Sequence, residues 1–187
     1  MTLPLVVGIT GATGAIYGVE LLKALHHLGY PAHLIVSEMG LRTARIELDM
    51  DAGDLRALAT VTYSNKDLAA AVASGSFLTA GMVIAPCSVK TLSGVANGFS
   101  DNLMIRTADV TLKERRPLIL MFRETPLHLG HLRLMTRAAE IGAVILPPMP
   151  AFYHRPKTLA DVVRQGVGRV LDQVGIAHEL APRWSGM

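Results

Sequence analysis

The chain has 187 residues, a length that fits one compact domain and excludes two independent catalytic domains. Half of the residues are hydrophobic and only 18% are charged, which excludes a disordered chain. The formal net charge is +3 and aromatic residues make up 5%, so the sequence lacks the basic stripe with interleaved aromatics that is typical of nucleic-acid binding. A single cysteine, Cys87, excludes an internal disulfide and a cysteine-rich metal site.

Two further classes of protein are disfavoured by the pattern of apolar residues. No apolar run approaches the roughly 20 residues that a membrane-spanning helix requires, and the first residues lack the charged and long apolar segments of a secretory leader. We therefore expect a cytoplasmic protein without a membrane span. Because so little of the chain is charged, we also expect apolar surface to be buried between subunits of a homo-oligomer.

Apolar runs alternate along the chain with segments that are long enough for helices. The first run, at 5–10, ends in a glycine-rich turn, after which apolar residues recur at helical spacing from Ile16 to Leu28 and stop at Gly29. The remaining predicted strands lie at 33–37, 82–87, 118–122 and 143–146.

The last predicted helix has the clearest ends and completes the fold prediction. Thr158 and Asp161 form a capping-box pattern, and an inward apolar stripe follows until Gly175. Because the strand runs are continuous rather than alternating, helices are expected on both faces of the sheet. The sequence predicts a single α/β domain over 1–187, with a three-layer, Rossmann-like (flavodoxin-like), doubly wound and mostly parallel sheet. The stripe consists of Leu159, Val163, Val167, Val170 and Val174.

The turn at 8–14, GITGATG, is the first candidate ligand site. Its small residues let backbone N–H groups and a helix N-terminus face a phosphate, and Thr10 and Thr13 add hydroxyl donors. The spacing is GxxGxxG rather than GxGxxG, and Ser37 stands where a ribose-binding acid would be, which favours a mononucleotide such as FMN. Because Glu38 is adjacent to Ser37, NAD is an alternative ligand. A tight strand-to-helix turn that binds no ligand is a second alternative.

A second candidate loop, PCSVKT at 86–91, follows the strand at 82–87. It places hydroxyls and N–H groups at the next helix N-terminus, so two adjacent polar helix starts would suit one flavin. Cys87 has no specific base in the pattern and is interpreted as a small buried hydrophobe.

Charged residues follow the next strand. Arg123 is suited to clamp a phosphate, and Glu124 to deliver a proton to a leaving oxygen. Arg106, Lys113 and Arg169 supply further cationic charge, although Arg169 faces either a pocket or solvent from the flank of its helix. A network of surface salt bridges is the alternative interpretation.

Histidine and tyrosine residues complete the set of candidates. His128 and His131 have the spacing of a metal site on one helix face, but no third ligand accompanies them, so we interpret them as hydrogen-bonding histidines and predict no metal. Tyr153, in the proline-bracketed loop 150–156, either offers its hydroxyl to a phosphate or packs against its surroundings.

Five segments in order carry a family resemblance. They are GITGATGAIYG (8–18), APCSVKTLSG (85–94), ADVTLKERRPLIL (108–120), RETPLHLGHLRLM (123–135) and PAFYHRP (150–156). With RVLDQVG and the terminal APRW, nearly the whole chain resembles the UbiX-type flavin prenyltransferases. The resemblance implies transfer of a dimethylallyl group from dimethylallyl phosphate to N5 and C6 of reduced FMN. The prenylated FMN serves UbiD-type decarboxylases, with ubiquinone biosynthesis as the expected pathway.

The resemblance also implies roles for individual residues. Glu124 would protonate the departing phosphate with Arg123 and Lys113 stabilising it, and Glu47 with Thr13 would move protons near the flavin. A homododecamer is implied, and we expect the tail at 176–187 to pack at a subunit interface. FMN contacts fall on Gly11, Ala12, Thr13, Ser37, Ser88, Val89, Lys90, Thr91 and Arg123. Dimethylallyl phosphate contacts fall on Tyr153, Arg169, Lys113, Arg106 and Trp184, the last being otherwise an interface anchor.

Two rival functions share the predicted fold. FMN-dependent cysteine decarboxylases have the same flavin site but lack the pairing of RETPLHLGHL with AFYHRP. A non-catalytic FMN carrier would need no acid–base set, whereas this chain has Glu47, Lys113, Glu124 and Arg169.

Overall fold

The computed structural model describes residues 2–184 and 186. Six parallel strands form one sheet in the order β3-β2-β1-β4-β5-β6. This is the strand order of the Rossmann fold, so the chain reverses its direction of winding between β1 and β4, where doubly wound proteins bind ligands. The strands are β1 (Leu5–Ile9), β2 (Ala32–Val36), β3 (Val61–Ser64), β4 (Gly81–Cys87), β5 (Leu118–Phe122) and β6 (Val144–Ile145).

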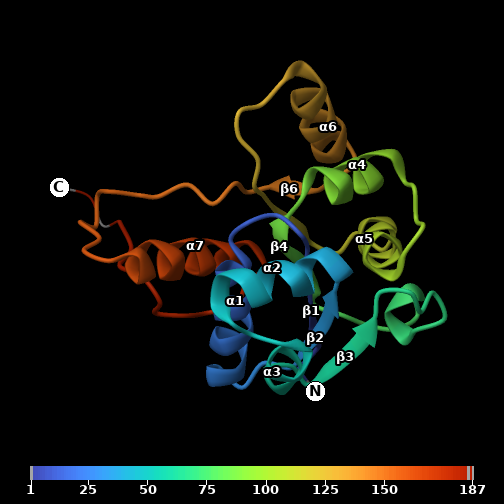
Figure 1. The fold of residues 1–187 in the computed structure, drawn as a ribbon, viewed down its shortest axis with the longest axis horizontal. Coiled ribbons are helices and arrows are strands. Elements are labelled where there is room, and N and C mark those ends of the chain that lie inside the picture. Colours follow the sequence, from blue (N-terminus) through green and yellow to red (C-terminus); the bar gives the residue numbers. More distant parts are fainter. Residues whose placement is uncertain (1, 185, 187) are drawn as a thin grey trace.

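Helices cover both faces of the sheet, which confirms the three-layer, doubly wound prediction (Figure 1). One layer contains α1 (Ala15–His27), α2 (Glu38–Leu48), the short α3 (Ala52–Ala57) and α7 (Leu159–Gln173). The other contains α4 (Val89–Asn97), α5 (Leu103–Lys113), α6 (Leu129–Glu140) and the short 3-10 helix η1 (Ala71–Ala73).

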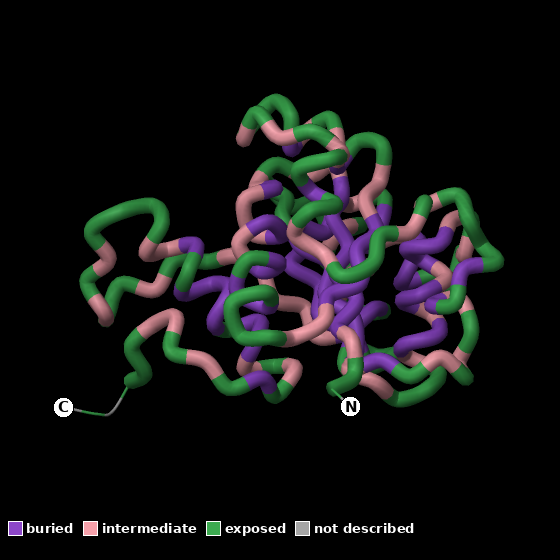
Figure 2. The backbone as a smooth tube through the Cα atoms, turned by 90° about the horizontal axis from the view of Figure 1, so that it is seen from below, coloured by how far each residue is buried: buried purple, intermediate pink, exposed green. Residues whose placement is uncertain are grey.

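Buried side chains alternate between the two layers along the central strands. In β1, Val7 and Ile9 pack among α1 and α7, whereas Val6 packs on the opposite side of the sheet. Figure 2 shows the buried backbone gathered in the middle of the molecule and the exposed backbone around it. Because both faces are covered, the central strands have continuous apolar runs instead of alternating ones.

One strand and one helix position differ from the sequence prediction. No strand was predicted at β3, because this edge strand is mostly exposed and has no apolar run. Leu159 was expected in the inward stripe of the last helix, but it is 85% exposed because it begins α7, before the helix reaches the core. Val163, Val167 and Val170 are buried as predicted.

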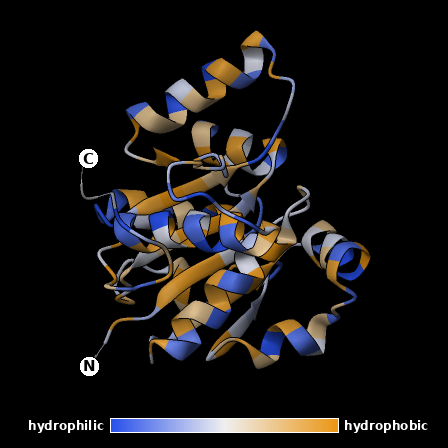
Figure 3. Ribbon diagram, turned by 90° about the vertical axis from the view of Figure 1, so that its left-hand side faces the viewer, coloured by the Kyte–Doolittle hydropathy of each residue, from blue (hydrophilic) through white to orange (hydrophobic). Residues whose placement is uncertain are grey.

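The helix α6 is the least buried part of the second layer. Ala138 is its buried residue, whereas Leu129 and Leu132 are 59% and 45% exposed. Figure 3 shows this helix at the top of the molecule, with apolar and polar positions mixed along its surface. In the described residues, no helix has both the length and the apolar character to cross a membrane.

Candidate functional site

The end of β1 is tied to the end of β4 by one buried hydroxyl. Thr10 donates from Oγ1 to the carbonyl oxygen of Pro86 at 2.6 Å and accepts from the N–H of Ser88 at 2.9 Å. Its side chain therefore joins the two glycine-rich and polar loops, which lie side by side as the sequence predicts. Thr10 was predicted to donate to a ligand, and that prediction is wrong because its hydroxyl is used inside the protein.

A carboxylate of the chain itself occupies the N-terminus of α1. Glu47 of α2 accepts from the N–H groups of Gly14 and Ala15, each at 2.9 Å, and from the hydroxyl of Thr13. A negative charge at this position is stabilised by the unpaired N–H groups and by the helix dipole. Glu47 and Thr13 are therefore together as predicted, but the N–H groups expected to face a phosphate are already satisfied.

A cavity of about 530 Å³ opens beyond the carboxyl ends of β1, β2 and β4. Ser37 caps α2 by accepting from the N–H of Gly40 at 2.9 Å. Ser88 caps α4 by accepting from the N–H of Thr91 at 3.4 Å. Of the residues predicted to bind the cofactor, the structure brings into the cavity lining Gly11, Ser37, Ser88, Lys90 and Thr91.

Other predicted cofactor residues adjoin this cavity without lining it. Ala12 and Thr13 continue the loop of Gly11, and Val89 is the first residue of α4. Gly11 is required by a close approach, because a Cβ atom there would lie 2.5 Å from Cβ of Met39. The turn therefore serves to bring two backbones together.

The part of the cavity that comes from the β3 side was not predicted from the sequence. Asn65, directly after β3, accepts from the N–H of Met104 at 2.9 Å, and Asn102 caps α5 by accepting from the N–H of Ile105. Both asparagines line the cavity. The N-cap position of Asn102 was a detectable signal, whereas Asn65 follows a strand that the apolar pattern does not reveal.

Arg123 and Glu124 follow β5 and are exposed. The N–H of Arg123 donates to the carbonyl oxygen of Cys87 at 3.1 Å, and Glu124 accepts from the N–H of Thr125 at 2.9 Å. Cys87 itself is fully buried, and burial raises the pKa of its thiol far above the ordinary value, so the thiol stays protonated. Its interpretation as a small buried hydrophobe is confirmed.

Two predicted cations lie outside the cavity of their own chain. Arg106 donates to the carbonyl oxygen of Ala73 at 3.2 Å and pairs with Asp109 at 2.8 Å. Lys113 ends α5 and pairs with Glu114. Met104 and Ile105 at the start of α5 line the cavity, and this 11-residue helix is about 16 Å long, so Lys113 lies at the end of the helix that is far from the cavity. Arg106 and Lys113 therefore do not line the cavity of their own chain, and their role in binding dimethylallyl phosphate stays a prediction.

A second hollow, of about 400 Å³, brings together the other predicted substrate residues, Tyr153, Arg169 and Trp184. The rings of Tyr153 and Trp184 meet edge to face with centroids 5.6 Å apart. Arg169 pairs with Asp172 at 2.8 Å. Among the described residues, none lines both this hollow and the cavity beside β1.

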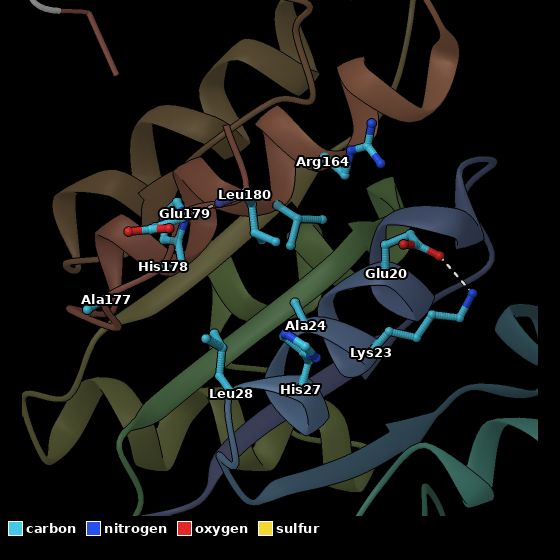
Figure 4. Close-up of a pocket in the computed structure, with 11 residues that line it drawn as sticks. Glu20, Lys23, Ala24, His27, Leu28, Arg164, Ala177, His178, Glu179 and Leu180 are labelled. Carbon is cyan, nitrogen blue, oxygen red and sulfur yellow. Dashed lines mark hydrogen bonds and ion pairs between the residues drawn. The ribbon is translucent and has the colours of Figure 1, made fainter. Parts of the chain in front are cut away.

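The first part of the C-terminal tail packs on its own chain. Ile176 is 4% exposed, and Figure 4 shows Ala177 to Leu180 beside α7 and across from Ala24 and Leu28 of α1. A hollow of about 640 Å³ remains between these segments. The predicted interface role of 176–187 stays a prediction, and its residues 185 and 187 lie outside the described part of the chain.

The two candidate metal histidines form a stacked pair at the start of α6. His128 caps this helix by accepting through Nδ1 from the N–H of Gly130 at 3.0 Å. The ring centroids of His128 and His131 are 3.6 Å apart. His128 is thus a hydrogen-bonding histidine, as interpreted from the sequence. The same interpretation is wrong for His131, because its Nδ1 is buried without a hydrogen-bond partner in the described residues.

The fold and the cavity together are those of a doubly wound α/β protein with a site of the kind that binds a mononucleotide. The family model described as Flavoprotein matches residues 2–164. The chain is 58% identical over 182 residues to a protein named Flavin prenyltransferase UbiX from Thauera aromatica, with 97% of this chain and 94% of the relative covered. On these grounds the chain belongs to the UbiX family of flavin prenyltransferases, which confirms the resemblance.

Two solved structures are similar to this chain along almost its whole length. AnUbiX (PadA1), solved in complex with FMN and dimethylallyl pyrophosphate, has a TM-score of 0.98 and 45% identity, and all of both chains is covered. A dodecameric FMN-dependent UbiX-like decarboxylase from Escherichia coli O157:H7 has a TM-score of 0.95 and 46% identity, with 98% of this chain and 100% of that chain covered.

Proposed function

We propose that this chain is a flavin prenyltransferase that joins the dimethylallyl group of dimethylallyl phosphate to N5 and C6 of reduced FMN and releases phosphate. The observation that carries the proposal is the TM-score of 0.98 to a relative solved with FMN and dimethylallyl pyrophosphate, over the full length of both chains. A cavity of about 530 Å³ at the switch point of the sheet is of the size that a mononucleotide requires.

The chain supplies a phosphate subsite at the start of α4. Ser88 already caps the N–H of Thr91, so the N–H groups of Val89 and Lys90 are the ones left for a phosphate. The ammonium group of Lys90 and the hydroxyl of Thr91 join them in the cavity lining. The start of α1 is less suitable, because Glu47 already accepts from its N–H groups and would repel a phosphate. The FMN phosphate therefore binds at α4, and Gly11, Ala12 and Ser37 flank the rest of the flavin.

Two carboxylates, Glu47 and Glu124, transfer the protons in this reaction. When bound, reduced FMN supplies the nucleophilic N5 and C6 atoms. Glu47, held beside Thr13 at the start of α1, accepts protons that these atoms lose. Glu124, exposed after β5, delivers a proton to the departing phosphate, whose charge Arg123 stabilises.

The complete site requires more than one subunit. Arg106 and Lys113 lie away from the cavity of their own chain, and the hollow with Tyr153, Arg169 and Trp184 is separate from it. Exposed apolar residues such as Phe152, at 72%, provide surface for contacts between copies. We therefore place these residues at the site of a neighbouring subunit in a homododecamer.

The product and its recipient follow from the same proposal. Prenylated FMN passes to a UbiD-type decarboxylase, with ubiquinone biosynthesis in the cytoplasm as the expected setting. No nucleic acid and no metal takes part in this scheme.

Anaerobic incubation with reduced FMN and dimethylallyl phosphate tests the activity directly. Mass spectrometry of the extracted flavin should show the gain of one C5 prenyl unit, and Glu124→Gln should slow that gain by about a hundredfold, because general acid catalysis is lost. Glu140→Gln, a change at an exposed glutamate that ends α6, is the matched control. Unaltered flavin that stays bound to the wild-type protein would contradict transfer and favour an FMN carrier or a cysteine decarboxylase.

A further inference from the structure

One carboxylate near the end of α7 accepts from three donors, one on the same helix and two in the tail that follows it. Asp172 accepts from Arg169 at 2.8 Å, from Arg183 at 2.9 Å and from Nε2 of His178 at 3.1 Å. Burial raises the pKa of this carboxyl, but the hydrogen bonds and charges of Arg183 and His178 outweigh burial and hold its pKa below the ordinary value. Asp172 is therefore ionised at neutral pH, although its side chain is only 18% exposed.

The contact with His178 fastens the tail to α7. The side chain of His178 is 4% exposed, and its Nδ1 accepts from the N–H of Leu180 at 3.2 Å, so the proton on Nε2 points to Asp172. Gly168 makes room for this ring, because a Cβ atom there would lie 2.8 Å from Cε1 of His178. Figure 4 shows His178 and Leu180 lying along α7.

The fastened tail completes the hollow of about 400 Å³. It carries Arg183 and Trp184 to the same hollow as Arg169 and Tyr153. Each guanidinium gives one nitrogen to Asp172 and keeps further N–H groups for a ligand. Two guanidinium groups and one carboxylate leave a net positive charge beside two aromatic rings, a combination suited to a phosphate ester with a short unsaturated chain.

We propose that Asp172 is a positioning residue for the prenyl phosphate and that Arg183, held by it, is a second phosphate-binding residue beside Arg169. This inference rests on the proposed function only in its choice of ligand. Without the carboxylate, the two guanidinium groups repel each other and the tail loses its shared attachment point. The phosphate then meets two disordered cations in place of two oriented ones.

Calorimetric titration of the oxidised, FMN-loaded full chain with dimethylallyl phosphate tests the inference without turnover. Asp172→Asn should raise the Kd for dimethylallyl phosphate about tenfold and Arg183→Gln about fivefold, since each removes a charge-assisted contact or its orientation. Asp161→Asn is the matched control, because Asp161, like Asp172, pairs with an arginine three residues away on α7 but lies outside the hollow. Its Kd should stay within about twofold of the wild type.

The controls separate this inference from the proposed activity. All three variants should bind FMN as the wild type does, because the FMN cavity shares no residue with the hollow. A wild-type chain that binds dimethylallyl phosphate without transferring it would contradict the activity and leave the inference standing. The inference is overturned if Asp172→Asn leaves the Kd unchanged or lowers it, if FMN affinity falls in parallel, or if the wild type does not bind dimethylallyl phosphate.

Discussion

The two candidate binding regions are built in different ways. The cavity beside β1 is formed by loops that follow buried strands, and its geometry depends on backbone contacts such as the approach of Gly11 to Met39. The hollow beside α7 is lined by exposed arginine and aromatic side chains, and Asp172 pairs with both arginines. Ligand binding in the cavity beside β1 should therefore be weakened most by substitutions that cause steric clashes. Ligand binding in the hollow beside α7 should be weakened most by substitutions that remove a charge.

The largest effect is expected from Gly11→Ala. The added Cβ would lie 2.5 Å from Cβ of Met39, so the loop must move and FMN affinity should fall by tenfold or more, a loss of about 1.4 kcal/mol or greater. Fluorescence titration with FMN measures this loss. Gly11→Ala combined with Met39→Gly removes the opposing Cβ and should recover most of the affinity, whereas equal losses in both variants would contradict the steric explanation.

Glu47→Ala should lower stability by about 1 to 2 kcal/mol, because the N–H groups of Gly14 and Ala15 lose their shared acceptor. Urea unfolding with and without the substitution gives the difference in free energy. Glu20→Gln, at a partly exposed residue of α1 that pairs with Lys23, should change stability by less than about 0.5 kcal/mol. A stable Glu47→Ala variant would show that water replaces the carboxylate at this helix end.

Thr158→Ala tests the hollow beside α7. Thr158 and Asp161 form the capping box at the start of α7, as the sequence predicts, so the substitution should cost about 1 kcal/mol of stability. Because α7 carries Arg169 and Asp172, dimethylallyl phosphate binding should weaken slightly while FMN binding stays constant. Parallel titrations with both ligands check this, and a change in FMN affinity alone would contradict the separation of the two regions.

The smallest effect concerns pH. Hydrogen bonds hold the pKa of Asp161 below its ordinary value, and the pKa of Asp172 is also lowered. A carboxyl with a lowered folded-state pKa stabilises the fold above the unfolded value of about 3.9 and loses that contribution as the pH falls further. Urea unfolding should therefore show a loss of stability below about pH 4, which is smaller in Asp172→Asn. An identical pH profile in that variant would contradict the role of this carboxylate.

Much of the fold could be predicted from the sequence, because local patterns report local structure. The runs at β1, β4 and β5 are apolar throughout, and the capping box of α7 marks its start within a few residues. β3 was missed because an exposed edge strand needs no apolar run. Of the candidate site, the residues that directly follow strands, such as Ser37 and Ser88, were placed together, since parallel strands end at one edge.

The amino-acid pattern alone was enough to predict the class of fold, the loops at the carboxyl ends of the strands and the family to which the chain belongs. Which donors meet which acceptors depends on the packing of the whole fold. Glu47 reaches Gly14 across 33 residues, and Asp172 gathers Arg183 from 11 residues away, because folding brings distant segments together. Periodicity and capping act over one or two turns of chain, whereas these contacts depend on how whole helices pack on the sheet.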